Sequence, residues 1–288
     1  MSKLQSCTEI TSLRAQIKQL KSQGKTIGLV PTMGNLHAGH LKLVVDAKQQ
    51  CDWVICSIFV NPMQFGPDED LDAYPRSLEK DIAGLVETGC DCLFTPEVSE
   101  IYPQGLQSQT VVSVPELGTS HCGSSRPGHF DGVTTVVSKL FNICQPDVAL
   151  FGLKDYQQFL IIQKMVADLL FPIKLIGVDT ERETDGLAIS SRNNYLSREQ
   201  RQIAPALYRT LRDTREQLAN GDKNFRSLEA SARTVLSEAG LKPDYFAICN
   251  ASSLQPARTE DIELVVLAAA FLGKARLIDN IRVSLDPR

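Results

Sequence analysis

Short apolar segments alternate with amphipathic helical segments through residues 26–178, and this alternation constrains the fold more than any other feature of the chain. The apolar segments are rich in β-branched and aromatic residues, which is typical of buried strands, and they cover 26–30, 53–60, 92–94, 148–151 and 174–178. The segments with helical periodicity cover 8–23, 41–50, 77–88, 133–144 and 155–170. Buried strands that alternate with helices predict an α/β protein with a Rossmann-like, doubly wound parallel sheet.

The pattern changes near residue 184, where we expect a second domain to begin. Residues 197–200 form a capping-box sequence that opens a long helix to residue 220, and a second helix is expected over 225–239. Strands are then expected near 245–249, 264–272 and 275–283. We therefore predict a Rossmann-like domain over 1–184 and a smaller α+β domain over 185–288, which closes over the site. Within the first domain, the proline- and glycine-rich stretch 96–130 is expected to hold one strand, 111–114.

Composition and charge exclude several classes of protein. The chain has 288 residues, is 43% hydrophobic and carries a net charge of −4, without the basic stripe that a nucleic-acid-binding protein needs. Its longest apolar run, 264–272, is too short to cross a bilayer, and its first residues lack the apolar core of a signal peptide. We therefore expect a cytoplasmic protein whose partners are neither nucleic acid nor membrane.

The eight cysteines form no C-x-x-C pair, and we interpret them as reduced thiols. Cys122, beside His121, is the nearest candidate for a catalytic cysteine, although its small neighbours and turn-like setting explain it without a catalytic role.

The segment PTMGNLHAGH, residues 31–40, is the most informative motif for function. It lies between an expected strand and an expected helix and holds two glycines and two histidines, His37 and His40. A helix that starts there offers N–H groups and a positive dipole end to a phosphate, and a neutral imidazole can donate one further hydrogen bond. The alternatives are surface histidines or half of a zinc site. For zinc, no third ligand stands close by, since the next acid is Asp46 and the next cysteine is Cys51.

Two further groups of residues fit a phosphate site. Lys154 and Asp155 follow the expected strand 148–151. The lysine there can reach a phosphate, while Asp155 either caps the next helix or binds a ribose. Residues 189–192 resemble a mobile phosphate-binding loop, and their two hydroxyls and guanidinium can follow charge as it moves on a phosphate chain.

Five sequence blocks, in this order, resemble those of the pantothenate synthetases, a family within the HxGH nucleotidyltransferase group. They are PTMGNLHAGHLKLV (31–44), SIFVNPMQFGPDEDLDAYPR (57–76), RPGHFDGV (126–133), FGLKDYQQ (151–158) and DGLAISSRNNYLS (185–197). The resemblance implies an ATP-dependent, AMP-forming ligase that joins (R)-pantoate to β-alanine through a pantoyl adenylate. It also implies Mg²⁺ bound with ATP, for which no protein ligand can be named, and a homodimer.

The resemblance assigns roles to individual residues. The catalytic group is expected to be His37, His40, Lys154 and Arg192. Gln64 and Gln158 are expected to bind pantoate from opposite walls, with Asn61, Arg126 and His129 also binding substrate. The residues expected to bind ATP are Met33, Gly34, His37, Gly39, His40, Gly152, Lys154, Asp155, Glu181, Ile189, Ser190, Ser191 and Arg192.

Three positions depart from the family pattern. An acidic or amide residue is usual where Leu153 stands, and a small residue, usually alanine, is usual at Asn35. Glu181 stands where a valine commonly contacts adenine through its backbone. An asparagine in the turn tolerates unusual backbone angles, so Asn35 is compatible with the motif. Two other functions stay open at this point: a nucleotidyltransferase that leaves AMP on its product, and a non-catalytic protein that senses ATP.

Overall fold

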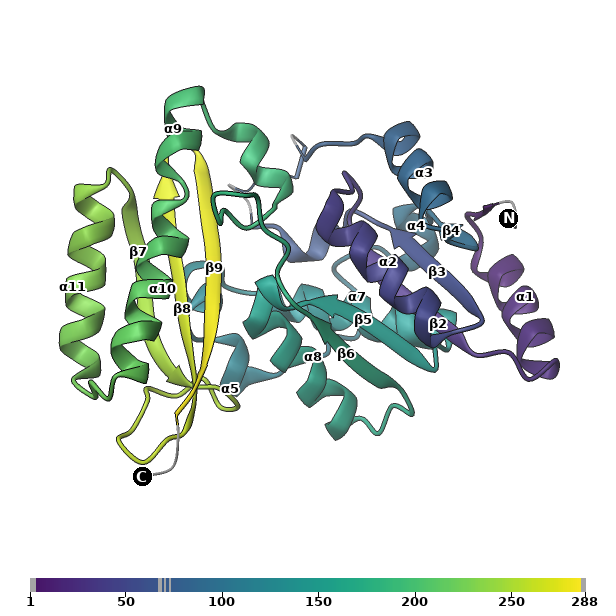
Figure 1. Cartoon of the computed structure of the whole chain (residues 1–288). Helices are drawn as coiled ribbons and strands as arrows, with labels where there is room; N and C mark the ends of the chain where they lie inside the picture. Colours follow the sequence, from purple (N-terminus) through teal and green to yellow (C-terminus); the bar gives the residue numbers. More distant parts are fainter. Residues whose placement is uncertain (1–3, 67–68, 70, 73, 286–288) are drawn as a thin grey trace. The chain divides into compact units, whose positions relative to one another are not determined.

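A computed structural model describes residues 4–66, 69, 71, 72 and 74–285, and its first part is built on a sheet of six parallel strands (Figure 1). The strands are β1 (Gln5–Cys7), β2 (Ile27–Thr32), β3 (Trp53–Ile58), β4 (Cys92–Phe94), β5 (Val148–Gly152) and β6 (Lys174–Val178). Their order in the sheet is β1-β4-β3-β2-β5-β6. The predicted parallel sheet is confirmed. The three-residue β1, which pairs with β4, was not predicted.

Helices cover both faces of this sheet. The residues that point to either face of its central strands are therefore buried. Val30, Val54 and Cys56 lie in one apolar cluster with Val44 and Leu85 from the covering helices, whereas neighbouring strand residues face the other way. The long helices of this part are α1 (Ile10–Ser22), α2 (Ala38–Gln50), α3 (Leu78–Glu87), α7 (His129–Cys144) and α8 (Tyr156–Asp168). Helix α2 begins three residues earlier than predicted, so His40 lies within its first turn.

The predicted strand at 111–114 is wrong. Its backbone bonds to side chains of α7 rather than to another strand: the Val112 N–H donates to Thr135 Oγ1 at 3.0 Å, and the Thr134 hydroxyl donates to the Val112 carbonyl. The surrounding stretch holds three short helices, α4 (Val98–Ile101), α5 (Pro115–Gly118) and α6 (Cys122–Ser125).

The second part of the chain contains an antiparallel sheet of three strands, β7 (Lys242–Asn250), β8 (Glu263–Leu272) and β9 (Ala275–Ser284). Its helices are α9 (Arg198–Ile203), α10 (Ala206–Ala219) and α11 (Phe225–Glu238), and their apolar faces share one core with the sheet. The predicted capping box is confirmed at Ser197 and Gln200. The single long helix predicted to residue 220 is wrong, because Pro205 lacks an N–H and separates α9 from α10.

The chain divides into two compact units, residues 1–153 with 158–179, and residues 154–157 with 180–288. The predicted boundary between functional domains at residue 184 stays a prediction. No helix in the described part of the chain combines the length and apolar character needed to cross a membrane.

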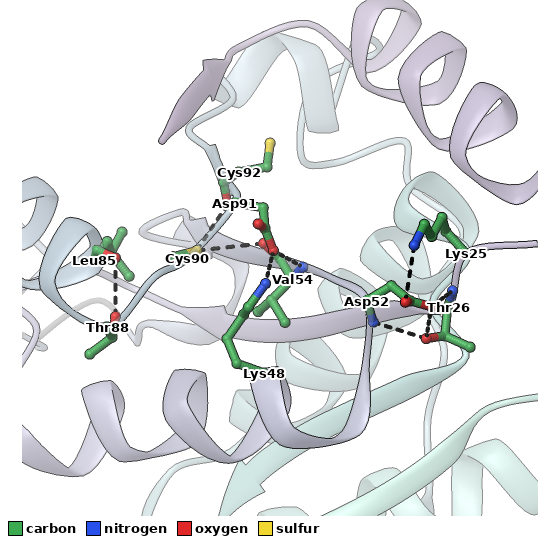
Figure 2. Close-up of polar contacts among 10 residues, drawn as sticks. All are labelled: Lys25, Thr26, Lys48, Asp52, Val54, Leu85, Thr88, Cys90, Asp91 and Cys92. Atoms are coloured by element: carbon green, nitrogen blue, oxygen red, sulfur yellow. Dashed lines mark hydrogen bonds and ion pairs between the residues drawn. The ribbon is translucent and has the colours of Figure 1, made fainter. Parts of the chain in front are cut away.

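Aspartates stand at the amino ends of the parallel strands and accept hydrogen bonds from the backbone of a neighbouring strand (Figure 2). Asp52, just before β3, accepts the Thr26 N–H at 2.9 Å, and Asp91, just before β4, accepts the Val54 N–H at 2.8 Å. Asp147, just before β5, accepts the Ile27 N–H at 2.7 Å. Carboxylates therefore close the amino end of these strands, and residues 33–40 follow the carboxyl end of β2.

Candidate functional site

The carboxyl end of β2 lies where the order of the strands reverses. Strand β2 pairs with β3 on one side and with β5 on the other, and the sheet extends from there in both directions. In open parallel sheets, ligands bind at such a switch point, beyond the carboxyl ends of the strands. The first helix to follow this position is α2, which carries the two histidines of the motif.

Residues 33–40, which we name the histidine turn, run from the end of β2 into the first turn of α2. Gly34 and Asn35 both adopt left-handed backbone angles, with φ of +84° and +50°. A side chain at residue 34 would also lie 2.9 Å from Ile58 Cγ2. His37 is the N-cap of α2, and its ring stacks on that of His40 with the centroids 4.0 Å apart. The structure therefore brings the two predicted histidines side by side at a helix N-terminus, next to Gly34 and Gly39.

A chain of buried polar groups fixes the orientation of the Gln64 amide. The Tyr102 hydroxyl donates to Asn61 Oδ1 at 2.7 Å, and Asn61 Nδ2 donates to Gln64 Oε1 at 3.2 Å. Gln64 Nε2 then donates to the sulfur of Met33 at 2.9 Å. Burial raises the pKa of the Tyr102 phenol, so this group stays a protonated donor. Since every hydrogen in the chain points the same way, Gln64 presents its NH₂ group on the side of the histidine turn.

Arg126, just before α7, and His129, its first residue, both contact the backbone carbonyl of Gln64. Arg126 makes a bidentate ion pair with Glu69, and its NH1 lies 2.9 Å from His129 Nε2. A guanidinium can only donate, so Nε2 accepts and His129 Nδ1 donates to the Gln64 carbonyl at 2.8 Å. Partial burial would raise the pKa of Glu69, but the hydrogen bonds and charge of Arg126 lower it on balance. The predicted substrate contacts of Arg126 and His129 stay predictions.

Gly132 allows α7 to approach the loop that carries Gln64. A Cβ atom at this position would lie 2.4 Å from the Met63 carbonyl oxygen and 2.7 Å from Gln64 Cα. Asn61 Nδ2 also donates to the Gly132 carbonyl at 3.0 Å. Only glycine therefore fits where the helix and the loop meet.

The remaining predicted residues of this unit lie near the carboxyl end of β5 or after it. Gly152 is the last residue of β5, and Gln158 is half-buried in the first turn of α8. The prediction that Gln158 faces Gln64 across the substrate stays a prediction.

In the second unit, strand β9 holds the two segments predicted to contact phosphate. Asn280 Nδ2 donates to the Lys154 carbonyl at 2.9 Å, and the Lys154 ammonium lies 3.5 Å from the Asp155 carboxylate. Asp279 makes a bidentate ion pair with Arg182 at 2.6 and 2.8 Å. The Arg182 guanidinium also lies over the Tyr208 ring, 3.8 Å from its centroid. Burial raises the pKa of Asp279, although Arg182 opposes that shift.

Residues 181–192 form a turn that leads into a short 3₁₀ helix, η3 (Ser191–Tyr195). The Ile189 N–H donates to the Glu181 carbonyl at 2.9 Å, and Arg182 pairs with Ala188 in an antiparallel bridge. Ser190 caps η3, because its hydroxyl accepts from the Arg192 N–H at 3.3 Å. The predicted group Glu181, Ile189, Ser190, Ser191 and Arg192 thus lies in one ordered segment anchored by Arg182.

The structure adds little support for a catalytic cysteine or for a zinc site. No disulfide joins any of the eight cysteines, and burial raises the pKa of several thiols, that of Cys90 to about 11. Cys122 is half-buried at the first residue of α6. In the described ranges, no group of three or more His, Cys, Asp or Glu side chains is placed to hold a metal ion, so His37 and His40 gain no zinc partner there.

Sequence reasoning missed the residues that hold the site in place. Asp81, Tyr102 and Asp279 are distant in sequence from the groups that they contact. The sequence around Asp81 gives no local signal, because Asp81 follows Glu79 and Lys80 in a helix, where charged residues are usually solvated. Its burial, with 2% of its surface exposed, is what marks it in the structure.

Comparisons with known proteins agree with one another. The family model described as pantoate-beta-alanine ligase matches residues 5–282. A pantothenate synthetase of Hahella chejuensis is 58% identical over 276 residues, which cover 96% of this chain and 98% of the relative. A crystal structure of pantothenate synthetase from Thermus thermophilus matches with a TM-score of 0.90 and 44% identity, covering 96% of this chain and 99% of that one. The structure of pantoate-beta-alanine ligase from Francisella tularensis, complexed with beta-gamma ATP and beta-alanine, matches with a TM-score of 0.80 and 35% identity, covering 97% of each chain.

Proposed function

This chain belongs to the pantoate–β-alanine ligase family, and from that premise we propose how its residues carry out the ATP-dependent joining of pantoate to β-alanine. The pantoate carboxylate attacks the α-phosphate of ATP, which gives pantoyl adenylate and pyrophosphate. The β-alanine amine then attacks the acyl carbon, and pantothenate and AMP leave. The observation that carries this proposal is the stacked His37–His40 pair at the N-terminus of α2, beyond the carboxyl end of β2.

The first step needs positive charge and hydrogen-bond donors around a crowded phosphate. His37 and His40 supply donors at the start of α2, where the helix dipole favours an anion. Lys154, Ser190, Ser191 and Arg192 supply an ammonium, two hydroxyls and a guanidinium, which follow the charge as pyrophosphate departs. The backbone around Glu181 and Ile189 and the glycines Gly34, Gly39 and Gly152 complete the nucleotide contacts in this proposal.

The orientation of Gln64 suits recognition of pantoate. A thioether sulfur is a weak acceptor, so the Gln64 NH₂ that now faces Met33 gains a stronger partner when a hydroxyl or carboxylate oxygen of pantoate arrives. Gln158 acts on the same substrate. The second step needs mainly a dry site in which the adenylate is held beside the amine, an effect of positioning.

We propose that Mg²⁺ enters with ATP and that phosphate oxygens and water supply most of its ligands, as is usual for this ion. We also propose a homodimer in the cytoplasm. Six of the eight cysteines are buried thiols, which suits a reducing compartment.

Isotope transfer tests the reaction. Pantoate labelled with ¹⁸O in its carboxylate should pass one labelled oxygen to AMP for each pantothenate formed, because the acyl–oxygen bond breaks in the second step. Mass spectrometry of the nucleotide product reads the result. ADP with label in inorganic phosphate would indicate an acyl phosphate instead. Pyrophosphate with AMP retained on the product would indicate a nucleotidyltransferase, and no product at all would indicate a sensor.

A further inference from the structure

The histidine turn is held by a carboxylate from a different part of the chain. The backbone N–H groups of Asn35 and Leu36 donate to Asp81 Oδ2 and Oδ1, each at 2.8 Å. The Ser77 hydroxyl lies 3.0 Å from Asp81 Oδ1 and 3.1 Å from the Asn35 side-chain oxygen. Asp81 lies in α3, and its buried carboxylate accepts donors that come from the turn and from the start of its own helix.

This carboxylate offsets an unfavourable backbone conformation. Gly34 and Asn35 are both left-handed, and such a conformation costs free energy at a residue with a side chain. With these angles, two successive N–H groups point to one place, where they would be buried without an acceptor if Asp81 were absent. The turn therefore depends on Asp81 for its conformation.

We propose that Asp81 is the positioning residue of the histidine turn, and that it sets where His37 and His40 lie by fixing the backbone of Asn35 and Leu36. Leu36 immediately precedes His37, the N-cap of α2, so a shift of its peptide group moves the first histidine directly. The catalytic consequence rests on the proposed function, in which both histidines contact phosphate. The positional consequence does not depend on it.

Asp81→Asn tests the proposal with little change of volume. One carboxylate oxygen becomes an NH₂ group that faces an N–H donor, so one of the two bonds to the turn is lost. We expect pantoate-dependent exchange of labelled pyrophosphate into ATP to slow by about 10- to 100-fold, because small misplacements of reacting groups cost that much. The KM for pantoate should stay within about 3-fold, since Gln64 is held by other residues.

The chain offers a matched control on the opposite edge of the same sheet, Asp91 (Figure 2). Asp91 is also buried, and it accepts a backbone N–H from Val54 and an ammonium from Lys48 at 2.6 Å. Asp91→Asn should lower the melting temperature but leave the exchange rate of the folded enzyme within about 2-fold, because the variant loses stability and not alignment. If both variants lose the same amount of melting temperature and keep the parent rate of pyrophosphate exchange, Asp81 is only structural and the proposal is overturned.

Histidine NMR separates this proposal from the proposed function. The chain has four histidines, and only His37 and His40 belong to the turn. In ¹H–¹⁵N spectra of the rings, Asp81→Asn should shift the signals of these two and leave those of His121 and His129 in place. Unshifted signals of His37 and His40 would overturn the proposal. Shifted signals in a protein whose unsubstituted form gives no pyrophosphate exchange would support it and refute the proposed function instead.

Ser77→Ala keeps the test decisive if Asp81→Asn does not fold. It removes one donor and leaves both backbone bonds to Asp81, so we expect a smaller shift of the same two signals. We also expect pyrophosphate exchange to slow by about 3-fold, because the lost hydrogen bond acts on the turn only through Asp81. No change in either measurement would count against the positioning role.

Discussion

At the scale of the residue, the amide of Gln64 shows how a buried hydrogen-bond chain determines what a side chain can recognise. Tyr102 can only donate to Asn61 in this arrangement, and Asn61 in turn donates to the oxygen of Gln64. The NH₂ group of Gln64 is the end that remains for a ligand. A glutamine on a solvated loop would present either end, whereas the buried neighbours of Gln64 leave only its NH₂ group, which pairs with an acceptor.

Truncation of the glutamines should separate pantoate from ATP. We expect Gln64→Ala and Gln158→Ala each to raise the KM for pantoate by about 5- to 150-fold, which corresponds to a lost buried polar contact of about 1–3 kcal/mol. ATP affinity, measured by calorimetry, should stay within a few-fold. Tyr102→Phe is the control for orientation: it leaves Gln64 in place and should raise the pantoate KM by less than Gln64→Ala does. If ATP affinity falls as much as pantoate affinity in either glutamine variant, that glutamine belongs to the nucleotide site.

At the scale of the element, hydrogen bonds to a neighbouring strand fix where the parallel strands near the centre of the sheet begin. Asp52 at the start of β3 accepts both the N–H and the hydroxyl of Thr26, each at 2.9 Å, just before β2 begins (Figure 2). The Asp52 N–H donates back to the Thr26 hydroxyl at 3.0 Å. These contacts, with Lys25 nearby, lower the pKa of Asp52 from 3.8 to about 2. The reciprocal hydrogen bonds between Asp52 and Thr26 thus fix where β2 and β3 begin relative to each other.

The sign of this shift gives a prediction for stability against pH. A lowered pKa in the folded protein means that the ionised carboxylate stabilises the fold above pH 3.8, and that this contribution is lost as the pH falls towards about 2. Asp52→Asn should therefore lower the free energy of unfolding at neutral pH, and its difference from the parent protein should shrink between these two values. Urea unfolding at a series of pH values measures it. A difference that stays constant across the acid range would contradict the assignment.

The elements also show what the sequence can predict. The strands and long helices of the first unit follow from local apolar patterns, and so does the strand–turn–helix setting of His37 and His40. The contact between Asp81 and the turn has no local signal, because it joins residues 45 positions apart. The wrong strand at 111–114 has apolar residues that suit a strand, but the hydroxyls of Thr134 and Thr135 take the backbone bonds that a strand would need. The break at Pro205 did have a local signal, a proline within a helical pattern.

At the scale of the whole molecule, each of the two units has an apolar core of its own among the described residues. One lies against one face of the parallel sheet and includes Val30, Val54 and Leu85, and the other joins the antiparallel sheet to helices α10 and α11 and includes Leu211 and Leu264. Units with separate cores can open separately.

A cavity in one core should show this separation. Leu211 is fully buried in the second unit, and Leu211→Ala should cost about 2–5 kcal/mol of stability there. Hydrogen exchange followed by mass spectrometry should detect faster exchange in β8 and β9, with β2 and β3 nearly unchanged. The reciprocal variant, Leu29→Ala in the parallel sheet, should reverse the pattern. A uniform loss of protection through both sheets would show that the molecule opens as one cooperative unit.

The close approach at Gly132 limits how the proposed pantoate site can be changed to accept another acid. On the α7 side the loop of Gln64 rests against a helix that has no room for even a methyl group, so that wall cannot be remodelled by substitution at Gly132. On the other side the neighbour of Gln64 is Met33, a flexible side chain whose shape adapts readily. Directed evolution towards bulkier hydroxy acids can make room beside Gln64 by substitution of Met33.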